Sequence, residues 1–395
     1  MISSTIIMKK IGWAAFVLIA YLGLCSCSLL RTKASPPPLS SVFPLQEESR
    51  VLYDGEINRM VQNSGGRLYF STRKGLVYCV DGPKKNILWK FSARSGISAA
   101  PCLSEGRVYC ADQENRLYSL DEAGKAVWEK KFEEKISSDV GQDQGKIFAG
   151  TQDGNILALD ALTGVEAWRF KSESAIQSGP VFWNRQIIFG TADGRLLFLT
   201  PDGRLLAAFK TKTGIRGPLF IDSNRLFYSL EDDTFNSLNL KSRRRRWAIR
   251  TGGFMTAPPA VDDRRIYFAN SNSVLFCLDK RGGEILWWRP MPSPSYFKPD
   301  LCGEEILAAT LSSLLLGFYK KTGENSGTLD PGQELKSNPL VLDSSLVINL
   351  YNQEAGQGIL VFLKRAGASP ILDQKNRKTL RKEISDEERR SPGAC

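Results

Sequence analysis

Residues 151–170 read TQDGNILALDALTGVEAWRF, a stretch with two turns, one apolar run and a tryptophan. Asp153-Gly154 predicts a tight hairpin turn, because glycine accepts the positive φ that such turns require. A strand of apolar residues, Ile156 to Leu159, follows this turn. Asp160 to Gly164 then forms a second turn before the strand that contains Trp168. The pattern is typical of short antiparallel strands joined by tight turns.

Two further strands are predicted just before this stretch. Ile136 to Val140 is expected to be the first strand of the unit, and Lys146 to Gly150 the second. The unit therefore contains four strands in about 40 residues, which is the content of one blade of a β-propeller.

The unit recurs at a nearly constant interval. Its tryptophans are Trp89, Trp128, Trp168, Trp247 and Trp287, spaced 39, 40, 79 and 40 residues apart. We expect Phe209 to occupy the tryptophan position in the double gap, because it follows Trp168 by 41 residues. A fixed period of this length indicates one supersecondary unit repeated along the chain.

The repeats predict an all-β fold, an eight-bladed β-propeller of four-stranded antiparallel blades. The seventh unit has no tryptophan, and the eighth ends before a fourth strand. Residues 49–54 resemble a lone fourth strand, so we expect this N-terminal strand to complete blade eight and close the ring. Seven blades with appendages are the alternative. The tryptophans are interpreted as wedges between neighbouring blades.

Composition limits the chemistry of the chain. It has 395 residues, 42% of them hydrophobic and 24% charged, with a net charge of +11 and no histidine. The missing histidine removes the commonest general base and a common metal ligand. Cys79 and Cys277 share a repeat position with Ser119, Ala158 and Ser237, which predicts small, buried free thiols there. A Cys102–Cys110 disulfide within one hairpin stays open as an alternative.

The N-terminus has the pattern of an export signal. Lys9 and Lys10 precede an apolar run from Ile11 to Leu24, too short to span a bilayer comfortably. The run ends in Leu24-Cys25-Ser26-Cys27, which resembles a bacterial lipobox with Cys27 as the lipidated residue. An ordinary secretory signal with incidental cysteines is the alternative.

Four segments are therefore predicted. They are a lipoprotein signal peptide (1–26), a lipidated cysteine with a Pro-rich tether (27–47), the propeller (48–365) and a charged, disordered tail (366–395).

The repeat resembles the PQQ-like repeat, most closely at residues 151–160 with Thr163-Gly164 and Trp168. A lipobox, a short tether and eight such blades are similar to the BamB-like family of barrel-assembly lipoproteins. The resemblance implies a non-enzymatic scaffold without cofactor or metal, a monomer within a complex. Its partner would be the periplasmic domains of the barrel-forming outer-membrane protein or another envelope protein. The implied location is the periplasmic face of the outer membrane, where the lipid anchors the chain and no nucleic acid is bound.

The resemblance also implies contact residues. Family members contact their partner through a loop that opens a middle repeat, and Gly214-Ile215-Arg216-Gly217-Pro218 stands at that kind of position. Arg216 and Ile215 are therefore candidate partner-binding residues, with a solvated loop arginine as the alternative. The next repeat lacks the aspartates that assist this contact in the family.

A second candidate surface is the basic run Arg243, Arg244, Arg245 and Arg246, which we place in the turn before Trp247. It would project from the propeller rim toward anionic headgroups, acidic glycans or an acidic partner. A solubilising turn is the alternative.

Two other functions stay open. One is a PQQ-dependent dehydrogenase, although the vicinal disulfide that such enzymes place over the cofactor has no counterpart in the predicted propeller. The other is a ligand-binding or sensing lipoprotein at the cell surface.

Overall fold

The computed structural model describes residues 42–62, 65–98, 101–342 and 345–366, and all regular elements of these segments are strands. The predicted signal peptide, the lipidation site at Cys27 and all but the first residue of the predicted tail lie outside the described residues. Within the described part of the chain, no helix has the length and apolarity needed to cross a membrane.

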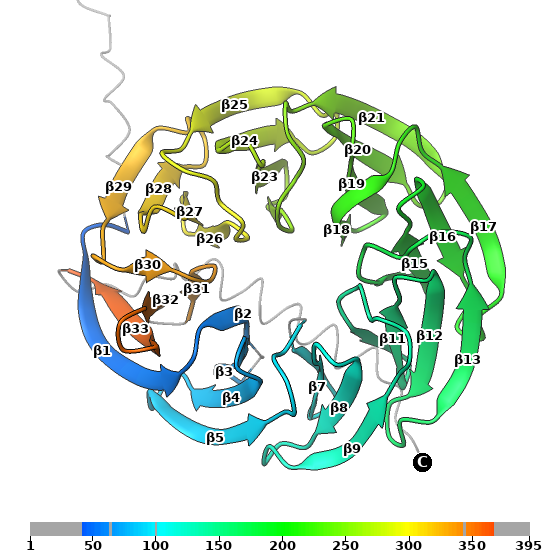
Figure 1. The fold of residues 1–395 in the computed structure, drawn as a ribbon. Helices are drawn as coiled ribbons and strands as arrows, with labels where there is room; N and C mark the ends of the chain where they lie inside the picture. The colour runs from blue at the N-terminus through cyan, green and yellow to red at the C-terminus, as the bar shows by residue number, and fades with distance from the viewer. Residues whose placement is uncertain (1–41, 63–64, 99–100, 343–344, 367–395) are drawn as a thin grey trace, which may run out of the picture. The chain divides into compact units, whose positions relative to one another are not determined.

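Eight antiparallel sheets are arranged in a ring (Figure 1). In blades one to seven the first strand lies inside and the last at the rim, whereas the rim strand of blade eight is the N-terminal β1 (Leu45–Asp54). Blade one holds β2 (Ile57–Gln62), β3 (Arg67–Thr72), β4 (Leu76–Asp81) and β5 (Asn86–Ser92). Blade two holds β6 (Cys102–Ser104), β7 (Arg107–Ala111), β8 (Arg116–Leu120) and β9 (Ala126–Lys131). Blade three holds β10 (Gly141–Asp143), β11 (Lys146–Gly150), β12 (Asn155–Asp160) and β13 (Glu166–Lys171). Blade four holds β14 (Val181–Trp183), β15 (Gln186–Gly190), β16 (Arg195–Leu199) and β17 (Leu205–Lys210).

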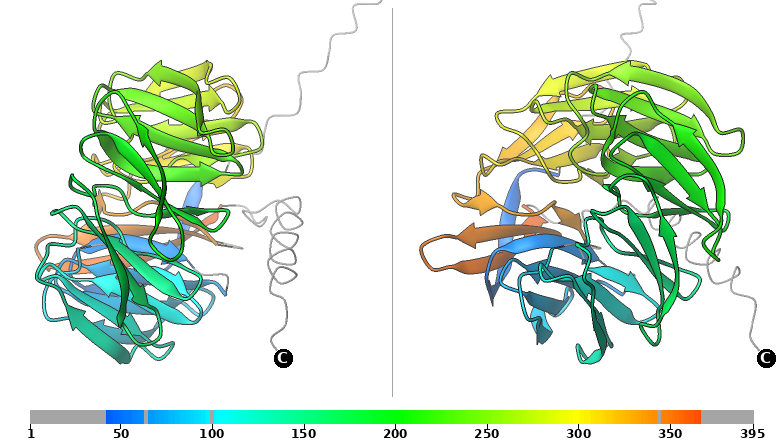
Figure 2. Two further views of the ribbon diagram at one scale, coloured as in Figure 1. Left: turned by 90° about the vertical axis from the view of Figure 1, so that its right-hand side faces the viewer. Right: turned by 45° about the vertical axis from the view of Figure 1, so that its right-hand side comes forward.

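The second half of the ring continues the same order (Figure 2). Blade five holds β18 (Ile215–Asp222), β19 (Arg225–Leu230), β20 (Thr234–Asn239) and β21 (Arg244–Arg250). Blade six holds β22 (Ala260–Val261), β23 (Arg265–Ala269), β24 (Val274–Asp279) and β25 (Ile285–Pro290). Blade seven holds β26 (Asp300–Cys302), β27 (Glu305–Ala309), β28 (Leu315–Tyr319) and β29 (Asn325–Leu329). Blade eight holds β30 (Glu334–Leu335), β31 (Leu340–Val341), β32 (Leu346–Asn352), β33 (Gln357–Arg365) and the N-terminal β1 (Leu45–Asp54).

The ring closes through its two chain ends, as predicted. β1 pairs antiparallel with β33, from Leu45 opposite Arg365 to Asp54 opposite Gln357. The strand is four residues longer than the predicted 49–54. Tyr53 is buried, its hydroxyl accepts a hydrogen bond from Asn349, and its ring covers Gly358. Closure therefore removes a sheet edge and adds an aromatic core residue to blade eight.

The hydrophobic core lies mainly between neighbouring blades. Tyr109 and Ala111 of blade two pack with Ile147 and Leu157 of blade three, and similar clusters occur around the ring. A single blade cannot bury both faces of its sheet, so each blade needs its neighbours for stability.

The tryptophans form the predicted wedges between blades. Trp89 on β5 donates its indole N–H to the Glu122 carbonyl in the last turn of blade two, 2.8 Å away. A Cβ on Gly124 of the same turn, where φ is +77°, would lie 2.5 Å from the Trp89 ring. The same close packing joins Trp128 to Gly164, Trp168 to Gly203, Trp247 to Gly283 and Trp287 to Gly323. We call this contact the tryptophan–glycine lock.

The prediction that Phe209 takes the tryptophan position of blade four is wrong. Trp168 lies opposite Ala158 in blade three, and the matching pair in blade four is Ala207 opposite Phe198. Phe209 instead corresponds to Phe170, two residues further along the outer strand. Large and small residues have exchanged strands in blade four, and spacing alone does not reveal an exchange across a sheet.

Blade seven borrows its missing ring from the N-terminus. The tryptophan position is Gly327, opposite Gly317, and a Cβ on either glycine would lie within 2.5 Å of the Phe43 ring. Next to it, Val42 donates its backbone N–H to the buried carboxylate of Glu305 at 3.0 Å. The segment before β1 therefore completes blade seven, while β1 itself completes blade eight.

The predicted first strand of unit three is displaced. Ile136 forms only an isolated bridge with Thr151, and β10 starts at Gly141. Between them the Ser138 hydroxyl accepts the backbone N–H of Gly150 at 2.7 Å. A side chain that takes a backbone donor interrupts the ladder, so the strand resumes further along.

Candidate functional site

Arg216 lies at the start of β18, the innermost strand of blade five. Its side chain is exposed, and its guanidinium carbon lies 4.0 Å from the centroid of the Phe254 ring of blade six. This cation–π contact holds the arginine in place across the boundary between the two blades.

In other blades, the residues at the position of Arg216 make a different contact. Ser137 donates its hydroxyl hydrogen to the Ile176 carbonyl of the next blade at 2.7 Å, and Thr256 donates to the Ser295 carbonyl at 2.6 Å. Short polar side chains at this position therefore join neighbouring blades. In blade five the backbone of Gly217, with φ +81°, approaches the Met255 carbonyl instead, and Arg216 keeps its guanidinium on the surface.

Ile215, the second predicted contact, is completely buried in the core between blades four and five. It occupies the position of Ile136 and Ile176, which are also buried. This burial removes Ile215 from the accessible surface, because its side chain anchors the entry of the chain into blade five in the core. A candidate contact at this loop therefore depends on Arg216.

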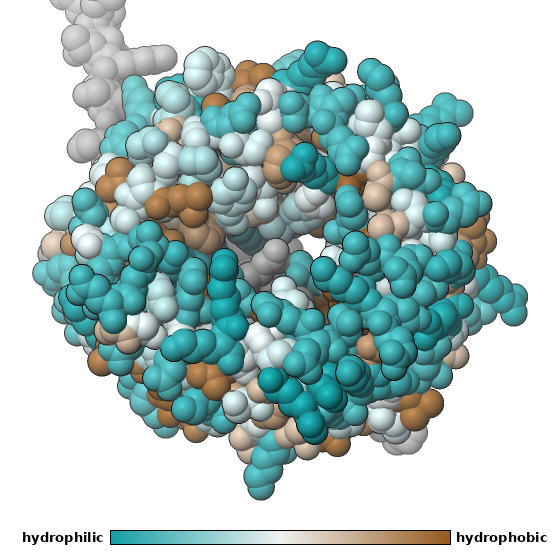
Figure 3. Space-filling model, viewed as in Figure 1, coloured by the Kyte–Doolittle hydropathy of each residue, from teal (hydrophilic) through white to brown (hydrophobic). Residues whose placement is uncertain are grey.

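Side chains of the next two blades add aromatic and apolar surface that was not assigned from the sequence pattern. Tyr296 takes the Arg216 position in blade seven and is 50% exposed, and Leu311 of the same blade is 44% exposed. Figure 3 shows a largely hydrophilic face with a hollow at its centre and hydrophobic residues over blade seven. We name Arg216, Phe254, Tyr296 and Leu311 the aromatic–arginine patch. Arginine and aromatic residues are enriched in the energetically important parts of protein interfaces. The repeat period would have found Tyr296, because it follows Thr256 by 40 residues, as Thr256 follows Arg216.

The basic run lies at the other edge of the same blade. Arg243 is in the turn with φ +52°, whereas Arg244 to Arg246 belong to the rim strand β21, so the prediction of a run confined to the turn needs this correction. Arg244 to Arg246 are exposed. Two strands separate β21 from β18, a distance of about 14 Å at the usual strand spacing. The structure therefore does not bring Arg216 and the basic run together.

Cys102 and Cys110 are both free thiols, which excludes the Cys102–Cys110 alternative in this structure. Burial raises the pKa of Cys277 and of Cys110 to about 12. Thiols held protonated in this way are poor nucleophiles and poor metal ligands. Across the described segments, no group of three or more Cys, Asp or Glu side chains is placed to hold a metal ion.

Comparisons with known proteins agree with this architecture. The sequence profile described as outer membrane protein assembly factor BamB matches residues 48–129, 113–216, 152–257 and 231–376. The chain is 24% identical over 256 residues to the outer membrane protein assembly factor BamB of Xanthomonas campestris pv. campestris, covering 58% of this chain and 63% of that protein. It is also 38% identical over 76 residues to the quinoprotein alcohol dehydrogenase PedE of Pseudomonas putida, covering 19% of this chain and 12% of the enzyme. Both alignments span less than two thirds of the relative's length.

The crystal structure of BamB from Moraxella catarrhalis has the same fold, with a TM-score of 0.68 at 16% identity over 83% of this chain and 99% of that one. The four overlapping profile matches together cover residues 48–376 without a gap, which is the whole ring. The chain therefore belongs to the family of the outer membrane protein assembly factor BamB.

Proposed function

We propose that this chain is a non-enzymatic scaffold that binds other proteins during outer-membrane protein assembly. The observation that carries the proposal is the family match over the whole ring. The described strands are all used to build blades, so function falls to loops and surfaces.

The aromatic–arginine patch is the proposed contact surface for the periplasmic domains of the barrel-forming subunit. Arg216 supplies a charged donor that the Phe254 ring holds in place, and Tyr296 and Leu311 supply apolar area. A supported cation loses little conformational entropy on binding, which favours a specific contact.

Lipidation of Cys27 would tether the scaffold to the periplasmic face of the outer membrane. The lipobox pattern supports this part of the proposal. Mass spectrometry of the chain purified from membranes tests it, with Cys27→Ser as the variant that should lose both the acyl mass and the membrane fraction.

Capture of the barrel-forming subunit tests the contact. We expect the full chain in crosslinked membranes to retain this partner and Arg216→Glu to reduce its recovery at least tenfold, the usual scale for an interface hot spot. Arg246→Glu makes the same charge change at the other edge of blade five and should retain the partner. Equal recovery with both variants would remove Arg216 from the interface, and absence of the partner with the unaltered chain would remove the proposed function.

A quinone-dependent dehydrogenase is the second candidate, because the likeness to PedE extends over 76 residues. It predicts saturable binding of pyrroloquinoline quinone with calcium, together with dye reduction in the presence of an alcohol. The scaffold proposal predicts neither.

A further inference from the structure

The boundary between blades four and five lacks the contacts that close other boundaries. In blade two, Arg107 donates to the Ala161 and Leu162 carbonyls of the next blade at 3.3 and 3.1 Å. Arg225 of blade five likewise donates to the Lys280 carbonyl of blade six. The corresponding residue of blade four is Gln186, whose buried Oε1 has no hydrogen-bond partner among the described residues.

The tryptophan–glycine lock is missing at the same boundary. Ala207 stands at the tryptophan position, and the turn of blade five carries Arg243 where the turns of blades two, three, four, six and seven carry glycine. The Arg243 guanidinium instead lies over the Phe198 ring. The arginine–carbonyl hydrogen bond and the tryptophan–glycine lock are therefore both replaced at this boundary.

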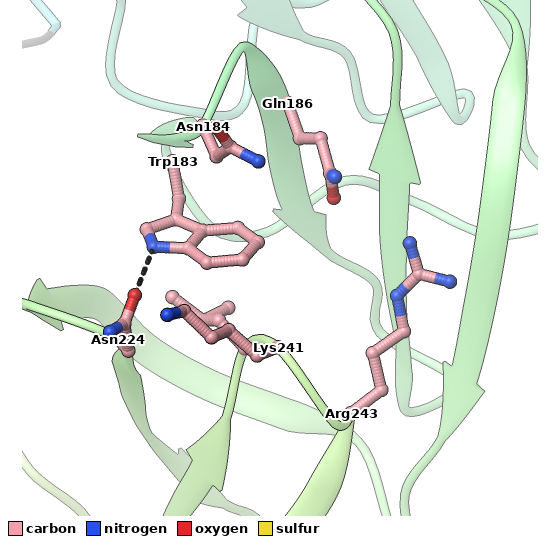
Figure 4. Close-up of a pocket in the computed structure, with 7 residues that line it drawn as sticks. Trp183, Asn184, Gln186, Asn224, Lys241 and Arg243 are labelled. Atoms are coloured by element: carbon pink, nitrogen blue, oxygen red, sulfur yellow. Dashed lines mark hydrogen bonds between the residues drawn. The ribbon is translucent and has the colours of Figure 1, made fainter.

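A pocket of about 630 Å³ opens at this boundary. Blade four contributes Trp183, Asn184 and Gln186, and blade five contributes Asn224, Lys241 and Arg243. Figure 4 shows the Trp183 indole, the Gln186 amide and the Arg243 side chain around the same space. The volume is in the range of small-molecule sites.

The lining has a consistent chemistry. It contains two cations, three amides and no carboxylate. Trp183 replaces the serine or aspartate of other blades, as at Ser104 and Asp143, and its indole N–H is held by Asn224 Oδ1 at 3.2 Å. The indole face is therefore a fixed apolar platform beside donors and positive charge.

We propose that this pocket binds an anionic sugar. The C–H face of a pyranose ring would pack on the Trp183 indole, while Arg243 and Lys241 would bind its carboxylate or phosphate. Sugar hydroxyl groups would hydrogen-bond with the side-chain amides of the lining. An acidic peptide offers the charge without the hydroxyl groups, so the pocket favours the sugar. The β14–β15, β18–β19 and β20–β21 turns form the pocket, and none of them contributes to the aromatic–arginine patch. The inference is independent of the proposed scaffold function.

Titration of the full chain in detergent tests the inference. The probes are glucuronate, glucose 6-phosphate and neutral glucose, followed by saturation-transfer NMR, with polygalacturonate by calorimetry to separate a free sugar from a glycan polymer. We expect the two anionic monosaccharides to bind with a Kd on the order of 1 mM, and glucose more weakly. Raising the salt concentration should weaken the anionic probes only.

Two variants introduce residues that other blades carry at the same position, so both should fold. Arg243→Gly restores the residue found at Gly203 or Gly283 and should weaken both anionic monosaccharides about tenfold without affecting glucose. Trp183→Ser, as at Ser104, should weaken all three monosaccharides. The control Arg250→Ser removes an exposed charge of β21 outside the lining and should change binding less than twofold.

Three results would overturn the proposal. They are absence of saturable binding by every anionic sugar, an equal loss with Arg250→Ser and Arg243→Gly, and binding of a tetraglutamate peptide in place of the sugars.

Discussion

The guanidinium carbon of Arg243 lies 5.2 Å from the centroid of the Phe198 ring. This pair replaces the tryptophan–glycine lock at one blade boundary, because Phe198 stands opposite Ala207 and Arg243 stands in the glycine turn. The three side chains Phe198, Ala207 and Arg243 therefore depend on one another, and enlarging the residue at Ala207 alone should be costly.

Ala207→Trp tests this dependence. The new indole would enter space that Phe198 and Arg243 already use, and overpacking of this kind costs about 1–3 kcal/mol. The triple variant Phe198→Ala, Ala207→Trp and Arg243→Gly rebuilds the arrangement of blade three and should recover most of the loss. Urea unfolding of the single and triple variants measures this coupling, and equal losses would contradict it.

Gly124→Ala should destabilise the ring more than Gly145→Ala. Both glycines have positive φ, +77° and +70°, so alanine costs about 1–2 kcal/mol of backbone strain at either position. A Cβ on Gly145 meets nothing within 4 Å, whereas one on Gly124 lies 2.5 Å from the Trp89 ring. The additional loss at Gly124, about 1–3 kcal/mol, isolates the steric part of the lock. Matching urea midpoints for the two variants would show that strain alone accounts for the glycine.

Trp287→Phe should cost more stability than Trp247→Phe. The Trp287 indole N–H donates to the Lys320 carbonyl at 3.0 Å, while the Trp247 indole N–H has no partner among the described residues. The Lys280 carbonyl of blade six corresponds to the Lys320 carbonyl of blade seven, and Arg225 of blade five donates to it. We expect a difference of about 1 kcal/mol, the usual net value of one hydrogen bond, in thermal or urea unfolding. The reverse order would contradict the geometry.

Phe43→Ala should leave a void over Gly317 and Gly327 and lower the free energy of unfolding by about 2–4 kcal/mol. The effect of Gly327→Trp on stability should change sign between the native chain and the Phe43→Ala chain. In the native chain the added indole would clash with Phe43, but in the Phe43→Ala chain it would fill the void and recover stability. Loss in both backgrounds would show that Phe43 is not the substitute ring of blade seven.

Alkaline pH should destabilise the protein through its buried thiols. The pKa of Cys110 is raised from 9.0 to about 12 by burial, and that of Cys277 equally. Between pH 9 and 12 the unfolded thiols lose protons that the folded thiols keep, so the free energy of unfolding falls as pH rises through this window. Cys110→Ala should make the fall shallower, and urea midpoints between pH 8 and 11 measure both slopes. A slope unchanged by the substitution would contradict the assignment to this thiol.

Much of the ring could be predicted from local pattern. Turn pairs such as Asp153-Gly154 and the 40-residue period can be recognised in the sequence itself. They were therefore sufficient to predict the eight blades and the closure by an N-terminal strand that the structure shows. Strand boundaries were less predictable, since Ser138 interrupts a ladder by accepting one backbone N–H.

The candidate sites depended on tertiary structure for a physical reason. Repetition along the chain determined the fold because each repeat must bury its faces against similar neighbours. Which side chain fills a given space depends on all the strands around it. Phe198 exchanged places with Ala207, Phe43 came from outside the repeats, and Ile215 was buried while Arg216 stayed on the surface. Sequence alone determined the repeating framework, and packing between segments distant in sequence decided where it is exposed, open and charged.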